Sequence, residues 1–148
     1  MSATGPSVFE KTLQESNHWL KLMMVELRTD SHHAAFGALR GALHALRDRI
    51  GPENAVHFGA QLPMLLRGAY YEGWHPAGTP TRERHLEEFI EHVAAKLPRA
   101  GKTEAGEAAR ACFAVMSRRL DRGEMLKLRH LLPHEALNLW PDELLRDA

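Results

Sequence analysis

The sequence contains a single cysteine, has no excess of either charge and has no long apolar run, and each of these absences removes a class of protein. Cys112 cannot form a disulfide within the chain. The 19 basic and 19 acidic residues give a formal net charge of zero, without the basic excess typical of nucleic-acid or anionic-membrane binders. The least polar stretch, residues 55–66, is shorter than the ~20 apolar residues that a membrane-spanning helix needs.

Export signals and common catalytic motifs are also missing. The first residues, MSATGPSVFEK, have neither the basic stretch nor the apolar segment of a secretory signal peptide, so we expect a cytoplasmic protein. There is no glycine-rich phosphate loop, Gly-x-Ser-x-Gly, Cys-x-x-Cys or His-Glu-x-x-His. These absences disfavour an enzyme, and we expect no cofactor.

Helical periodicity is present along nearly the whole chain, with almost no strand alternation. In residues 84–97, apolar side chains recur every three or four residues with glutamates between them, as in an amphipathic helix. Residues 36–50 and 109–120 carry the same stripe, from Phe36 to Ile50 and from Ala109 to Leu120. The pattern predicts an all-α fold whose core includes Leu43, Leu46, Phe89, Phe113 and Met116.

The chain also resembles itself after a shift of 70 residues. This shift places Leu43 on Phe113, Tyr70 on Trp140 and the Leu-Pro pair at 62–63 on the pair at 132–133. We therefore expect two pseudo-symmetric repeats of three to four helices, packed into one bundle and one structural domain. The first repeat is residues 1–74, the Gly- and Pro-rich connector is 75–81, and the second repeat is 82–148.

Within each repeat, the stripe predicts four successive helical segments. The first spans about residues 8–27 and 82–97, and the second about 33–50 and 103–120. A third segment ends at the Leu-Pro pair, and a fourth follows it. Proline suits the first turn of a new helix and disrupts a continuous one, so each Leu-Pro pair is predicted to form a corner.

The run ALRDRIGPENAVHFGAQLPMLLRGAYYEGWHPAG, with the later TRERHLEEFIEHVAAKL, resembles the bacterial family called domain of unknown function 2267. Members of that family are similar to this chain in repeating an all-helical unit twice, with a QLP corner before a YYEGW-like segment. The resemblance runs from about Phe9 to Trp140. The second copy departs from it, because no glutamine precedes Leu132-Pro133 and the YYEGW-like segment is reduced to residues 139–141. The resemblance implies the fold and a cytoplasmic location, and it implies no activity.

Ten histidines raise the question of a metal site, because imidazole is a common ligand of transition metals. His130 and His134 have the helical i, i+4 spacing, but a proline lies between them. His85, Glu88 and His92 fall on one helical face. No histidine maps onto another under the 70-residue shift, so we favour solvated surface histidines. A metal-dependent enzyme that uses the histidines stays an alternative.

Two groups of arginines invite different readings. The second repeat has a local basic group that could bind nucleic acid weakly, and we favour internal pairing with the glutamates of residues 83–91. This basic group consists of Arg118, Arg119, Arg122, Lys127 and Arg129. Arg40 with Arg110, and Arg49 with Arg119, recur at equal positions in the repeats. We expect them to fasten carboxylates or the carbonyls at helix ends.

The best candidates for a binding surface are the aromatic side chains and the histidine beside the connector, namely Tyr70, Tyr71, Trp74 and His75. The alternative, which is the more frequent case, is an aromatic plug that packs the connector onto the domain. Cys112 lies on an apolar stripe and is expected to be a buried small hydrophobe. We therefore predict a helical binding or scaffold module with an unidentified protein or small-molecule partner. Homodimerisation is one arrangement open to it.

Overall fold

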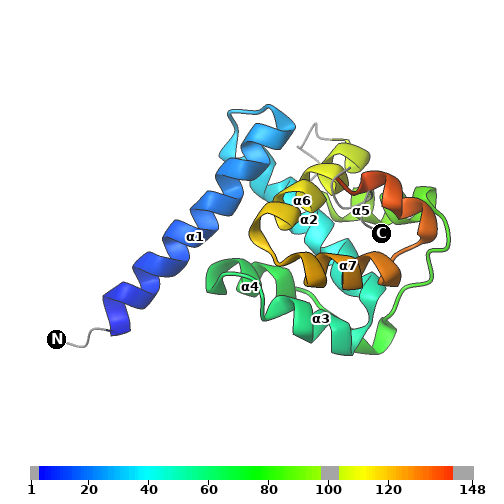
Figure 1. Ribbon diagram of the computed structural model, residues 1–148, viewed down its shortest axis with the longest axis horizontal. Helices are drawn as coiled ribbons and strands as arrows, with labels where there is room; N and C mark the ends of the chain where they lie inside the picture. Colours follow the sequence, from blue (N-terminus) through cyan, green and yellow to red (C-terminus); the bar gives the residue numbers. More distant parts are fainter. Residues whose placement is uncertain (1–3, 98–103, 142–148) are drawn as a thin grey trace.

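The computed structural model describes residues 4–97 and 104–141, and in these residues it is an all-helical bundle without strands (Figure 1). The α-helices are α1 (Thr4–Leu27), α2 (His32–Ile50), α3 (Pro52–Gly59), α4 (Met64–Tyr71), α5 (Leu86–Lys96), α6 (Ala105–Arg119) and α7 (Arg122–Leu131). Two 3-10 helices, η1 (Pro76–Gly78) and η2 (His134–Leu139), complete the order. The predicted all-α class is confirmed. No helix in the described part of the chain is long and apolar enough to cross a membrane.

Helix α2 lies at the centre of the bundle, packed against α1, α5 and α6. Of its 19 residues, 13 are buried, and many of these are alanine or glycine. Small side chains let neighbouring helices approach closely. At Gly41, for example, an added Cβ would lie 2.9 Å from Cδ2 of Leu97 and 3.1 Å from the carbonyl oxygen of Lys96.

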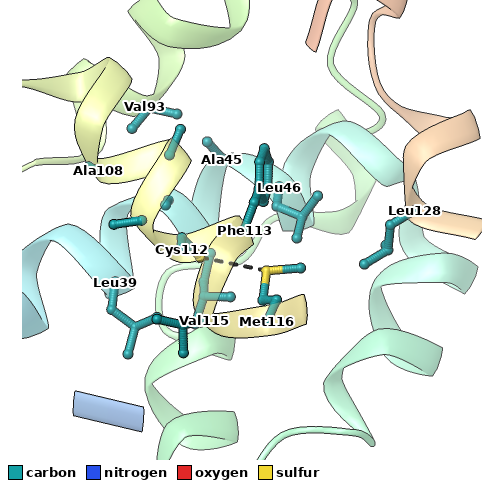
Figure 2. Close-up of a cluster of buried hydrophobic side chains, with 14 of the residues drawn as sticks. Leu39, Ala45, Leu46, Val93, Ala108, Cys112, Phe113, Val115, Met116 and Leu128 are labelled. Atoms are coloured by element: carbon teal, nitrogen blue, oxygen red, sulfur yellow. Dashed lines mark hydrogen bonds between the residues drawn. The ribbon is translucent and has the colours of Figure 1, made fainter. Parts of the chain in front are cut away.

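The five core residues predicted from the stripes are all buried. Leu43, Leu46, Phe89, Phe113 and Met116 have exposed fractions of 0 or 1%. Figure 2 shows Phe113 and Met116 of α6 facing Leu46 of α2. Because burial of large apolar side chains is the main favourable term in folding, this α2–α6 contact anchors the bundle.

Short local signals determine where the helices begin and end. Ser31 caps α2 by accepting a hydrogen bond from the backbone N–H of Ala34 (3.0 Å). Gly51 ends α2 with a φ of 86°, a left-handed conformation that glycine adopts without steric cost. Pro52 follows in the first turn of α3.

The two Leu-Pro pairs form the predicted corners, because α4 begins directly after Pro63 and η2 directly after Pro133. Two of the four corresponding pairs begin 70 residues apart: α3 and α7 begin at residues 52 and 122, and α4 and η2 begin at residues 64 and 134. The other two pairs do not, since α1 and α5 begin at residues 4 and 86, and α2 and α6 at residues 32 and 105. Superposition of the two halves, helix for helix, stays a prediction.

Three expectations about local structure need correction. The helix predicted over residues 82–97 is shorter, because Glu88 Oε1 accepts hydrogen bonds from the backbone N–H groups of Arg84 and His85 and caps α5 at Leu86. Helix α6 begins at Ala105, and residue 103, where we predicted its start, lies outside the described residues. Phe36 is 38% exposed, since it lies at the start of α2 beside a groove.

Helix α1 is the element that departs most from a compact bundle. Its C-terminal half packs on α2 and α6, whereas its N-terminal half projects beyond them at the lower left of Figure 1. We call residues 4–15 the arm and the remaining described residues the body. Ser16, Trp19 and Met23 are buried in the body, while Phe9 and Leu13 on the arm are exposed.

Candidate functional site

Large exposed apolar side chains gather where the arm meets α4. In the described residues, eight such side chains are exposed, and six belong to the arm, to α4 or to the start of α2. We call these six the arm surface: Val8, Phe9, Leu13, Phe36, Met64 and Leu65. An exposed apolar patch of this kind commonly marks an interaction site.

The arm surface is exposed because the stripe of α1 is longer than the body that covers it. Phe9, Leu13, Ser16 and Leu20 follow at steps of four, three and four residues, so they share one helical face. Ser16 is 6% exposed and Leu20 is half-buried, whereas Phe9 is 67% exposed and Leu13 51%. One continuous face therefore passes from covered to uncovered at about residue 16.

The start of α4 contacts α1 at the base of the arm. The backbone N–H of Leu65 donates to Oγ1 of Thr12 over 2.9 Å, which satisfies one free N–H at the start of α4. Arg67 holds the preceding corner, since its Nε donates to the carbonyl of Gly59 (3.0 Å) and its Nη2 to that of Leu62 (2.9 Å). The QLP corner thereby positions α4 against the arm.

A groove of about 390 Å³ lies on one side of this contact, between α1, α4 and the start of α2. Its walls are mostly apolar and include Leu20, Phe36, Leu65 and Leu66. Ser16 also lines the groove, and its hydroxyl is buried without a hydrogen-bond partner in the described residues. The groove can accept an apolar side chain from another molecule.

A second pocket, of about 480 Å³, lies on the other side of α4 and is more polar. Trp19, Lys11, Glu15 and Arg119 contribute to its lining. Arg119 is exposed here and, within the described residues, makes no contact that matches those of Arg49 with Glu83, so the expectation that the two arginines play equal roles is wrong.

Of the four residues predicted to form a binding surface, Tyr70 is not on the surface. It is fully buried, its hydroxyl donates to the carbonyl of Ala55 over 2.7 Å, and its ring meets Phe58 edge-on at 5.6 Å. Burial raises the pKa of the Tyr70 hydroxyl. Tyr70 therefore fastens α4 to α3, because its position on the inner face of α4 outweighs its place beside the connector.

The other three residues lie progressively further from the core. Tyr71 and Trp74 are half-buried, with ring centroids 5.3 Å apart, and His75 is exposed. The Tyr71 ring packs on Gly59, where an added Cβ would lie 2.5 Å from its hydroxyl oxygen. This arrangement matches the aromatic plug, and it leaves Tyr71, Trp74 and His75 as the predicted residues that a partner could reach.

Arg47 is a structural residue that the sequence analysis missed. Its side chain is 1% exposed, and its Nη1 donates to the carbonyls of Tyr70 and Glu72, each over 2.8 Å. These carbonyls end α4, so Arg47 fastens that helix to α2, and its Nε also donates to Asp48 over 2.9 Å. The signal was its position four residues after Leu43, on the apolar face of the helix.

A cluster of charged groups connects α2, α5 and the end of the connector. Nδ1 of His92 lies 2.5 Å from Oε1 of Glu83, and its Nε2 lies 3.4 Å from Oδ2 of Asp48. Lys96 and Arg49 flank the two carboxylates, with Lys96 Nζ 3.6 Å from Asp48 Oδ2 and Arg49 Nε 3.9 Å from Glu83 Oε2. We call these five side chains the ionic cluster.

The contacts in the ionic cluster shift the pKa values of His92 and Asp48. Hydrogen bonding to Asp48 raises the pKa of His92, burial opposes that rise, and Glu83 adds to it. Burial would raise the pKa of Asp48, but hydrogen bonds from His92 and Arg47 and the nearby positive charges lower it to about 2. The raised pKa of His92 and the lowered pKa of Asp48 both favour the charged form of the group, and the contact between them joins α5 to α2.

The proposed metal-binding face of α5 does not form. His85 Nδ1 lies 2.9 Å from Oε1 of Glu135, Glu88 caps the helix, and His92 lies in the ionic cluster. Hydrogen bonding to Glu135 raises the pKa of His85. Across residues 4–97 and 104–141, no three His, Cys, Asp or Glu side chains are grouped so that they could hold a metal ion.

The remaining arginines fall into two groups. As predicted, Arg110 donates to a helix-end carbonyl, that of Glu26 in the last turn of α1 (3.0 Å). Arg49 fulfils the carboxylate alternative, since its Nε lies 3.9 Å from Oε2 of Glu83, and it also donates to the Glu83 carbonyl (3.2 Å), which lies outside any helix. In the basic group, Arg118 pairs with Glu26 at 3.3 Å and Lys127 with Glu124 at 3.7 Å. These two pairs correct the predicted pairing with the glutamates of residues 83–91.

Cys112 behaves as predicted. It is fully buried in α6, and burial raises the pKa of its thiol to about 12. The dashed line in Figure 2 marks its contact with the sulfur of Met116 at 3.6 Å. A protonated, enclosed thiol acts as a small apolar side chain.

Comparison with known proteins identifies a family without naming an activity. The family described as "Uncharacterized conserved protein (DUF2267)" matches residues 16–139 of the chain. No curated protein matches it. The match starts at Ser16, the first buried residue of α1 from Ser7 onward, so the arm lies before the matched segment.

Proposed function

We propose a function from the surface of this chain. The chain belongs to the DUF2267 family, and the description of that family names no activity. The chain acts as a non-catalytic module that binds another protein, and its binding site is the arm surface. The observation that carries this proposal is that six of the eight large exposed apolar side chains of the described residues belong to the arm, to α4 or to the start of α2, where Phe36 and Leu65 line the groove.

The charges elsewhere on the molecule support an apolar rather than an ionic partner. Arg118 and Lys127 already pair with carboxylates of the same chain, which weakens the case for nucleic-acid binding. The net charge of zero points the same way. His85 and His92 have separate carboxylate partners, so we do not propose a metal-dependent reaction.

A photo-crosslinking side chain tests the proposal when it is placed singly in the full chain and activated in cells. Positions 9 and 65 lie on the arm surface, and position 56 on α3 is the matched control, because Val56 is exposed and apolar but lies outside that surface. We expect adducts from positions 9 and 65 that are absent from position 56. Equal labelling at all three positions, or none at 9 and 65, would overturn the proposal.

The same experiment tests the predicted binding residues beside the connector. His75 is the most exposed of these residues, so position 75 is the fourth crosslinking site. Adducts from position 75 without adducts from positions 9 and 65 would move the binding site to Tyr71, Trp74 and His75. A cytoplasmic location belongs to the same proposal, and cell fractionation of the full chain checks it.

A further inference from the structure

The arm and the groove are two incomplete apolar features that lie along the same face of α1. On the arm, the side chains of Phe9 and Leu13 are 67% and 51% exposed. The groove is an apolar hollow with Ser16 and Leu20 on one wall and Leu65 on the other. The arm therefore lacks a surface to pack against, and the groove lacks a side chain that would fill it.

From this juxtaposition we propose that the partner of the arm surface is a second copy of this chain, with two α1 helices packed antiparallel and each arm seated in the groove of the other copy. The inference rests on the proposed function and names its partner. An isologous contact of this kind uses the same patch on both copies, so it closes into a dimer.

The spacing along α1 supports this antiparallel arrangement. Suppose that the twofold axis passes near Leu13. Phe9 lies four residues before Leu13, so in an antiparallel pair it faces the residue four positions after Leu13 in the other copy, which is Asn17. Asn17 and Ser16 both line the groove. The arrangement therefore places each exposed Phe9 ring at the groove, and the two Leu13 side chains against each other.

Charge complementarity favours a second copy over an unrelated helix. Glu10 and Lys21 are exposed on the outer flank of the same face of α1, beyond Phe9 and Leu20. In an antiparallel pair, equal flanks face each other, so Glu10 of one copy approaches Lys21 of the second copy. At this register the two residues are about one and a half turns apart along the axis, within reach of a lysine side chain.

Sedimentation equilibrium of the full chain tests the inference. We expect a dimer of twice 16.7 kDa that dissociates on dilution. Phe9→Glu should weaken the dimer at least about 30-fold, since it places a charge in the apolar groove of the other copy. Val56→Glu is the control, because it puts the same charge on an exposed apolar site of α3 and should leave the dimer unchanged.

The register has its own test. Leu13→Cys should form a disulfide-linked dimer under mild oxidation, because the two copies of position 13 meet at the axis. Val56→Cys should not, and the native Cys112 is buried in both variants. Circular dichroism of each variant checks that the helices are intact.

The outcomes separate this inference from the proposed function. A monomeric wild-type chain, or a dimer unaffected by Phe9→Glu, overturns the second copy as partner. If position 9 then crosslinks a different protein in cells, the arm surface remains a binding site and only the partner is wrong. A monomer that gives no adducts at positions 9 and 65 overturns both.

Discussion

The arm and the body carry one apolar stripe in different surroundings. Along α1, Trp19 and Met23 are 2% and 0% exposed, while Phe9 and Leu13, at the same periodicity, are more than half exposed. Helix α1 packs on α2 and α6, and in the arm Thr12 accepts a hydrogen bond from the start of α4. The comparison shows that amphipathic periodicity identifies the face of a helix that will be buried, but not the surface that covers it.

The family match follows the same division. It begins at Ser16 and ends at Leu139, so it spans the body and leaves the arm outside. The body contains the features that hold the bundle together, among them Arg47 and the ionic cluster. If the comparison is sound, substitutions in the body change stability, and substitutions on the arm change association.

The largest expected effect is on the body. Phe113→Ala removes a ring that packs edge-on against Trp140 at 4.5 Å, in a fully enclosed site. We expect a loss of about 3–5 kcal/mol in the free energy of unfolding, from lost transfer energy and the cavity left behind. Urea denaturation measures it, and an unchanged midpoint would mean that α6 is packed in a different rotation.

Arg47→Met should cost about 3 kcal/mol in the same assay. The substitution keeps much of the buried aliphatic stem but leaves the carbonyls of Tyr70 and Glu72 without their donor. Arg49→Met is the control: the Arg49 side chain is 23% exposed and donates to one carbonyl, so about 1 kcal/mol is expected. Equal losses of stability in the two variants would show that the buried guanidinium of Arg47 contributes no more than the partly exposed one of Arg49.

His92→Gln should remove a pH dependence that belongs to the body. Because the folded-state pKa of His92 is raised above 6.5, its contribution to stability is complete below that pH and is lost as the pH rises through the raised pKa. The wild type should therefore lose more stability than His92→Gln between about pH 6 and 9. His85→Gln, at a fully solvated pair, should resemble the wild type, and identical profiles for all three would contradict the role of the ionic cluster.

At acid pH the sign is opposite. The folded-state pKa of Asp48 is lowered to about 2, so its contribution is present above its unfolded value of 3.8 and is lost as the pH falls toward 2. Asp48→Asn should flatten the wild-type decline in that window. Chemical denaturation at a series of pH values measures the stability on both the acid and the alkaline side. A wild-type stability that does not decline below pH 3.8 would contradict the role given to Asp48.

The smallest expected effect on stability is on the arm. Phe9→Ala makes the same chemical change as Phe113→Ala, but Phe9 is 67% exposed in the single chain. At concentrations where the chain is monomeric, the free energy of unfolding should stay within about 0.5 kcal/mol of the wild type. A loss comparable to that of Phe113→Ala would show that the arm packs on the body, and it would contradict the distinction between the arm and the body.

Much of the fold could be predicted, because the chain's local signals agree with one another. The all-α class, the five core residues and the two Leu-Pro corners followed from periodicity and from the conformational limits of proline. The buried role of Cys112 followed from its place on a stripe. Whether the two halves superpose as repeats is still a prediction, which a helix-by-helix superposition will test.

The candidate site could be predicted only in part, because each missed feature depends on groups distant in sequence. Tyr70 was predicted to lie on the surface, but in the structure its hydroxyl donates to the carbonyl of Ala55, fifteen residues earlier in the chain. His92 looked like half of a metal site, and it lies instead between carboxylates of α2 and the connector. The arm surface was not predicted, since the exposure of Phe9 depends on where the body ends.

By itself, the sequence determined which residues form helices, which face of each helix is apolar and where the corners fall, because these properties depend on neighbours within a few residues. Only the tertiary structure decided which apolar faces are covered and which charges meet. Burial and ion pairing depend on distances between segments brought together by folding, as where Arg47 meets the end of α4. The same reason leaves Phe9 uncovered while Trp19, on the same helix, is enclosed.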